Sequence, residues 1–225
     1  MTTFTRRTVL ASAASLSAAA TLPGWASAPM LGPSQARFRR FALGKFEVTT
    51  LLGGTAVREN PQSIFGMNVS PDEFNAVSEA ARLPTDAAKF FFTPTIVNTG
   101  SELILFDTGL SGESITGVLA EAGYSPDMVD KVVITHMHGD HIGGLITAGV
   151  PTFPNATYIT GAREFDAWSK MDNEGFQTNV VPLAEKMDMI EDGASGFAGH
   201  MAMAAFGHTP GHMVHLLESE GNALV

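Results

Sequence analysis

The stretch that decides the fold is Thr135-His136-Met137-His138-Gly139-Asp140-His141, which places three imidazoles and one carboxylate within six residues. It begins at the end of Lys131–Thr135, a β-branched run that predicts a buried strand. Alternate side chains of an extended segment share one side, so His136 and His138 are expected to point together. Asp140 and His141 follow in a glycine-rich turn and can reach a second point nearby. Imidazole and carboxylate are the ligands of catalytic zinc sites, so the stretch predicts two neighbouring metal positions.

A second histidine cluster follows about 70 residues later, in Gly207-His208-Thr209-Pro210-Gly211-His212. All seven histidines of the 225-residue chain lie after residue 135. A third short sequence, Asp107-Thr108-Gly109, ends a predicted strand in a sharp turn. In layered α/β folds, ligands bind where strands end, which makes these turns the candidate site.

Together these sequences resemble the metallo-β-lactamase-fold hydrolases, over roughly residues 41–225. Within them the chain is most similar to the exported methyl parathion hydrolase-like branch, near the lactone-cleaving enzymes. Four further stretches carry this similarity: Leu43-Gly44-Lys45-Phe46-Glu47-Val48, Val97-Asn98-Thr99-Gly100-Ser101, Ile134-Thr135-His136-Met137-His138 and Phe153-Pro154-Asn155-Ala156. The resemblance implies an α+β fold, a four-layer αββα sandwich whose C-terminal half is incomplete in this chain.

The resemblance also implies roles for individual residues. His136, His138 and His208 would hold the first metal, and Asp140 and His141 would begin the second, with Asp140 as the catalytic carboxylate. Asp107 would orient a ligand imidazole; its alternative is a turn-forming residue. Trp168 and Phe176 would line the substrate pocket, although Trp168 is equally compatible with a core anchor. Outside this set, packing rather than ligation is expected for His212 and His215, and a surface position for His200.

The implied activity is metal-dependent hydrolysis, in which a hydroxide between two divalent ions attacks a neutral ester, lactone or phosphotriester. The expected cofactor is Zn²⁺, two per complete protein, and Mn²⁺, Co²⁺ or iron suit the same ligands. The bridging Asp and last His of the family would follow Val225, so the chain is expected to be truncated, to bind about one zinc ion and to be inactive alone. Two alternatives remain open: a truncated, non-catalytic periplasmic metal-binding module, and an iron-dependent oxygenase of the same fold.

The amino-acid composition limits the classes of partner and metal site that the chain can have. The chain has 13 Lys and Arg against 23 Asp and Glu, for a net charge of −10. Nucleic-acid binding depends on phosphate contacts, so the acidic balance argues against nucleic acid as a partner and against a nuclease of the same superfamily. With no cysteine, disulfides and thiolate metal sites are excluded. A small neutral substrate is expected, and a homodimer is compatible with the sequence.

The N-terminal residues predict an export signal. Arg6 and Arg7 precede an Ala- and Ser-rich stretch, and Ala26-Ser27-Ala28 has the small residues of a cleavage site. Residues 1–28 are therefore predicted to be a twin-arginine-type signal peptide and residues 29–40 a linker, which gives a periplasmic or secreted location. The apolar run of about 14 residues is shorter than the roughly 20 that span a bilayer, so no stable membrane insertion is expected.

Along residues 41–225, hydrophobic periodicity and turn signals predict the elements. A strand is expected within 41–52 and a loop over 53–69. Helices are expected over 70–82, 112–122 and 162–171. Further strands are expected over 95–98, 103–106, 131–135, 156–160, 201–206 and 212–218.

Overall fold

The computed structural model describes residues 36–225, so the predicted signal peptide and most of the predicted linker lie outside the described residues. A seven-stranded mixed sheet organises this part of the chain, in the order β1-β2-β5-β6-β7-β10-β11. Its strands are β1 (Phe38–Leu43), β2 (Phe46–Leu51), β5 (Thr95–Asn98), β6 (Leu103–Phe106), β7 (Lys131–Ile134), β10 (Thr157–Gly161) and β11 (Met187–Ile190). The strands from β6 to β11 run parallel, and the others pair antiparallel.

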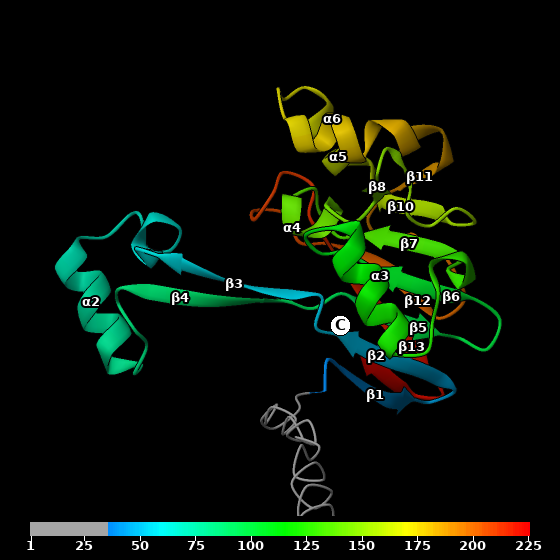
Figure 1. Ribbon diagram of the computed structural model, residues 1–225, viewed down its shortest axis with the longest axis horizontal. Helices are drawn as coiled ribbons and strands as arrows, with labels where there is room; N and C mark the ends of the chain where they lie inside the picture. The colour runs from blue at the N-terminus through cyan, green and yellow to red at the C-terminus, as the bar shows by residue number, and fades with distance from the viewer. Residues whose placement is uncertain (1–35) are drawn as a thin grey trace, which may run out of the picture. The chain divides into compact units, whose positions relative to one another are not determined.

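Helices cover one face of this sheet (Figure 1). They are α3 (Gly112–Glu121), α5 (Ala162–Ser169) and α6 (Glu174–Asn179). Their apolar sides pack with alternate strand residues such as Leu105, Val132 and Ile134 into the larger hydrophobic core. A strand covered on both faces must be apolar on both, which explains the continuous hydrophobic runs of β6 and β7.

A smaller antiparallel sheet covers the other face, built from β12 (His200–Ala204), β13 (Met213–Ser219) and β14 (Asn222–Leu224). Leu217 of this sheet packs with Val97, Ile104 and Val133 of the large sheet in a second core. The predicted α+β class is therefore confirmed, with two sheets face to face. Residues 36–225 supply three layers of the predicted αββα sandwich.

Several predicted elements are confirmed, including the strands over 95–98 and 103–106 and the helix that follows Ser70. That helix, α2 (Pro71–Ala80), begins where the Ser70 side chain accepts a hydrogen bond from the Glu73 backbone N–H. The remaining short elements are α4 (Gly139–Ile142), β8 (Ile146–Thr147), β9 (Val150–Pro151) and three 3₁₀ turns at Pro61–Ser63, Pro126–Met128 and Val181–Lys186.

Two predictions at the N-terminal side were wrong. Residues 38–40, assigned to the linker, belong to β1, which pairs with β2 across a tight turn where Gly44 has φ +57°. The stretch 53–69, predicted as a loop, contains β3 (Gly54–Glu59), which pairs with β4 (Ala87–Phe92). This two-stranded ribbon extends away from the main sheet and carries α2 at its end (Figure 1).

The parallel strands bring the turns that carry the candidate site residues to one edge of the large sheet. The residues after β6, β7 and β10 all leave the sheet at their carboxyl ends, where Asp107, Thr135 and the start of α5 lie next to one another in strand order. Within the part of the chain that the structure describes, no helix combines the length and apolarity needed to cross a bilayer.

Candidate metal centre

His136 and His138 come directly from the end of β7, as the alternation of an extended segment requires. His138 is the last extended residue, with φ −66° and ψ 152°, and precedes the single turn α4. His136 is 3% exposed, whereas His138 is half-buried. The third imidazole, His208, comes from the loop between β12 and β13, where Gly207 has φ +135°.

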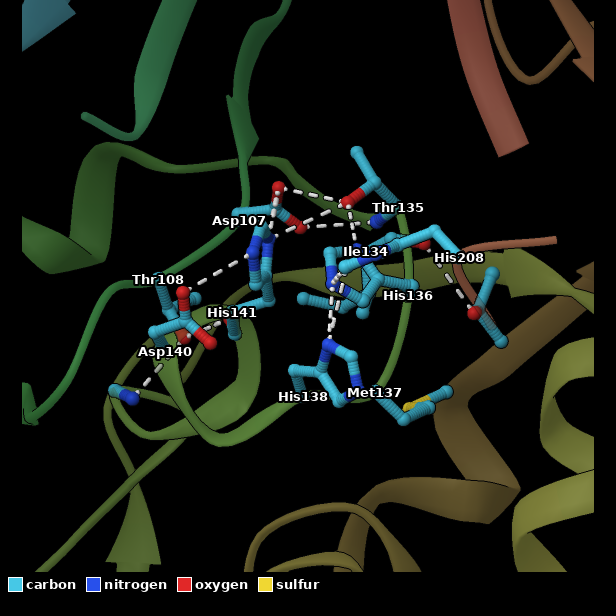
Figure 2. A network of polar contacts seen from close by, with 12 residues as sticks. Asp107, Thr108, Ile134, Thr135, His136, Met137, His138, Asp140, His141 and His208 are labelled. Atoms are coloured by element: carbon cyan, nitrogen blue, oxygen red, sulfur yellow. Dashed lines mark hydrogen bonds and ion pairs between the residues drawn. The ribbon is translucent and has the colours of Figure 1, made fainter. Parts of the chain in front are cut away.

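Three ring nitrogens, one from each of these histidines, form a nearly equilateral triangle (Figure 2). His136 Nε2 lies 3.1 Å from His138 Nδ1 and 3.1 Å from His208 Nε2, and the third side measures 3.2 Å. Tetrahedral zinc with Zn–N bonds of 2.0–2.1 Å separates its nitrogens by about 3.3 Å. The spacing of this triangle therefore fits a tetrahedral metal ion with one position left open. The three histidines that form it are called the tripod below.

Two of the three tripod histidines, His136 and His138, are held in the neutral form that binds a metal ion. Burial, together with the nearby His141, His138 and His208, lowers the pKa of His136 to about 3. Burial and His208 also lower the pKa of His138. The Thr135 hydroxyl lies 3.0 Å from His136 Nδ1, which leaves Nε2 for the triangle.

Asp140 and His141 lie beside the tripod and point toward each other, with His141 Nε2 3.5 Å from Asp140 Oδ2. Asp107 holds the other side of the His141 ring, because its Oδ2 lies 2.8 Å from His141 Nδ1. Burial alone would lower the pKa of His141, but the hydrogen bonds to Asp107 and Asp140 outweigh it and raise the pKa to about 9. The hydrogen bond to His141 in turn lowers the pKa of Asp140 to about 2. In the metal-free chain the pair is therefore ionic, with a proton where a second metal would need a lone pair.

Thr135 is a contact residue that the sequence analysis did not single out. Its backbone N–H donates to Asp107 Oδ1 and its hydroxyl lies 2.9 Å from Asp107 Oδ2. Asp107 itself adopts φ +58°, a left-handed conformation that Asp tolerates better than most residues. Thr135 therefore links the tripod, through His136, to the Asp140–His141 pair, through Asp107 (Figure 2).

The family model of the metallo-beta-lactamase superfamily matches residues 93–224, which carry all of these side chains. The chain belongs to this superfamily. It is 45% identical over 49 residues to the exodeoxyribonuclease WalJ of Streptococcus pneumoniae, a match that covers 22% of this chain and 18% of that protein. It is 27% identical over 113 residues to an N-acyl homoserine lactonase of Bacillus cereus, covering 50% of this chain and 42% of the lactonase.

Solved structures of the superfamily show the same fold. The dizinc quorum-quenching lactonase AidC superposes with a TM-score of 0.73 at 23% identity, covering 83% of this chain and 72% of AidC. Among the curated relatives, the matches cover between about a fifth and three-fifths of the relatives' length.

Three further histidines, His200, His212 and His215, do not belong to the tripod. The His212 ring lies 4.9 Å from the His136 ring, and its Nδ1 donates to the Ala205 carbonyl. The prediction that His200 lies on the surface was wrong, because it is 5% exposed and stacks on Phe197. It also pairs with His215, its Nε2 lying 2.8 Å from His215 Nδ1. Pairing of β12 with β13 buries these two rings together.

The predicted substrate-contacting aromatics are both buried. Trp168 is 8% exposed, lies within the larger core and meets the His138 ring in a T-shaped contact with 5.7 Å between the ring centroids. Phe176 is 1% exposed and packs on Phe165 at 5.4 Å. Burial in the core leaves the Phe176 ring no free face for a substrate, so the structure does not support the role predicted for it.

A different aromatic wall borders the site. Two adjacent cavities of about 150 and 350 Å³ reach Asp140 and share Phe92. His141 lines the smaller cavity. The larger is bounded mainly by apolar side chains from the 3₁₀ turn after β3, from β4 and from the turn after β6, namely Ile64, Phe90 and Leu110. The run Phe90-Phe91-Phe92 was a signal for this wall, but only the pairing of β3 with β4 places it beside the site.

Proposed function

We propose that this chain forms the metal-binding part of a hydrolase that cleaves small neutral esters, with lactones as the first candidate and phosphotriesters as the second. The observation that carries the proposal is the triangle of ring nitrogens with sides of 3.1–3.2 Å, contributed by two loops 70 residues apart in sequence. Without a metal ion, three imidazoles gain little from this arrangement, because one N–H cannot form full hydrogen bonds to two facing ring nitrogens at once.

His136, His138 and His208 would hold the first metal, with zinc as the expected ion, and Asp140 with His141 would supply ligands to a second. When bound, such ions lower the pKa of a water molecule and polarise the oxygen of the electrophile. The chain's own residues prepare the ligands. Asp107 fixes the His141 ring with Nε2 toward Asp140, and burial keeps His136 neutral.

A small neutral substrate with an apolar group fits the surroundings of the site. The aromatic wall of Phe90 and Phe92 offers apolar surface beside Asp140, and among the described residues Arg58 is the one Lys or Arg side chain that lines these cavities. The net charge of −10 disfavours anionic substrates, including nucleic acid. The lactonase relatives and neighbours support a lactone as the first compound to test.

The test combines metal content with turnover. The full product of the reading frame would be purified, its zinc, manganese, cobalt and iron measured, and hydrolysis of an N-acyl lactone, an aryl ester and an aryl phosphotriester followed with and without a chelator. We expect zinc to co-purify and chelator-sensitive hydrolysis of at least one substrate.

Two variants sharpen the test. His208→Ala should lose both metal and turnover, whereas Asp166→Asn, on the exposed side of α5, should keep both. Hydrolysis that survives in His208→Ala, or metal-loaded protein that cleaves none of the three substrates, would contradict the proposal.

A further inference from the structure

The side chain of Glu164 is fully buried, although it carries an ionisable carboxyl group. It lies in the first turn of α5, and a glutamate at such a position in a sequence usually faces solvent. No cation lies within ion-pair distance of it among the described residues. A buried carboxylate without a cation is costly unless hydrogen bonds compensate it, so its contacts need an explanation.

Three donors surround this carboxylate, and they come from both metal-ligand loops. Glu164 Oε1 accepts from the Met137 backbone N–H at 3.0 Å, at the residue between His136 and His138. Glu164 Oε2 accepts from the Thr209 hydroxyl and from the Gly211 backbone N–H, both at 2.8 Å. Thr209 directly follows the ligand candidate His208.

The backbone is shaped to allow this approach. A Cβ on Gly211 would overlap the backbone nitrogen of Glu164, and a Cβ on Gly161 would lie 2.9 Å from the Gly211 carbonyl oxygen. Two glycines therefore let the loop after β12 press against the junction of β10 and α5. This contact explains why the sequence after His208 contains both Thr209 and Gly211.

We propose that Glu164 is a positioning residue, which holds the His136–His138 loop and the His208 loop in the register that a metal ion requires. Among the described residues its hydrogen bonds go to the main chain and to Thr209, not to a ligand side chain. It acts by fixing the main chain on either side of the tripod, so that the triangle is set before metal arrives. The inference rests on the proposed metal site and adds a residue that neither histidine motif contains.

The test is zinc affinity, measured by competition with a chromogenic chelator on the purified full chain. Glu164→Gln keeps the shape but turns one acceptor into a donor, and Thr209→Val removes one donor while keeping the volume. We expect each to weaken zinc binding by about 10-fold or more, within the 10–100-fold range of groups that orient metal ligands. Because both variants weaken the same three-donor network, their effects should not add, and the double variant should bind zinc less weakly than the product of the two single losses predicts.

Two controls separate positioning from general destabilisation. Asp166→Asn changes an exposed carboxylate on the same helix, and Tyr158→Phe removes a buried hydroxyl that donates to the Phe153 carbonyl away from the site. Both should bind zinc within twofold of the wild type. The visible spectrum of the Co²⁺-loaded chain gives a second readout, since Glu164→Gln should change its bands and the controls should not.

The outcomes distinguish the inference from the function on which it rests. Zinc affinities within twofold of the wild type in both Glu164→Gln and Thr209→Val, with unchanged Co²⁺ spectra, would overturn the role of Glu164 and leave the proposed hydrolase intact. A wild-type chain that binds neither zinc nor cobalt would overturn the proposed function and this inference with it. Circular dichroism of each metal-free variant confirms that folded chains are compared.

Discussion

Lowering the pH from 6 to 5 should destabilise the chain through His200 and His215, two imidazoles that are neutral in the folded state. The Gly196 N–H donates to His200 Nδ1, so the proton of that ring must sit on Nε2, which then donates to His215 Nδ1. His215 carries its own proton on Nε2, which is buried and finds no partner among residues 36–225. Neither ring has a place for a second proton.

The direction and size of this change in stability follow from the difference in proton binding between the folded and unfolded states. Burial lowers the pKa of His200 to about 4, and burial together with His200 and His212 lowers that of His215 to about 3. An unfolded histidine, with a pKa of about 6.5, takes up its proton between pH 7 and 5 while these folded rings do not. The unfolded state therefore binds more protons in this window, and stability falls with falling pH by roughly 1 kcal/mol per histidine per pH unit.

The measurement is urea unfolding at pH 6.0, 5.5 and 5.0, extrapolated linearly to zero denaturant. His215→Gln is the matched variant, because its side-chain oxygen can accept from His200 Nε2 but does not titrate. The free energy of unfolding should fall between pH 6 and 5 by roughly 1 kcal/mol less in this variant than in the wild type. Equal slopes would refute the buried, neutral pair.

Two further predictions concern the second ligand pair and export. Asp107→Asn should lower the pKa of His141 from about 9 toward its ordinary value, as followed by NMR, because the charge that stabilises the imidazolium is lost. Asp107→Ala, which also leaves the Thr135 N–H without an acceptor and strains a positive φ, should cost roughly 2–4 kcal/mol in urea unfolding, and a cost no greater than that of Asn would contradict this. Arg6→Lys with Arg7→Lys should retain the precursor in the cytoplasm if residues 1–28 are a twin-arginine signal. Unchanged delivery in a strain without that translocase would contradict the assignment.

The parts of the fold that could be predicted depend on local pattern. The alternation that brings His136 and His138 to one side is a property of any extended chain. The Ser70 helix cap and the apolar runs of β5 and β6 are likewise recognisable from a few neighbouring residues. These elements appear where the sequence predicts them.

The parts that were missed depend on long-range pairing. Gly54–Glu59 becomes a strand because Ala87–Phe92 pairs with it nearly 30 residues later, and nothing near Gly54 indicates that partner. His200 is buried because the β13 strand, with His215, pairs with its strand and because Phe197 stacks on its ring. Glu164 looks like an ordinary helix residue until the loop of Thr209 folds against it.

The proposed metal site requires His136, His138 and His208 to bind one ion together. The decisive measurement is a crystal structure of the full chain grown with zinc, with anomalous data collected at the zinc edge. We expect an anomalous peak at roughly 2.0–2.1 Å from His136 Nε2, His138 Nδ1 and His208 Nε2. A zinc-soaked crystal with no peak between these three atoms, or with His208 turned away from the other two rings, would contradict it.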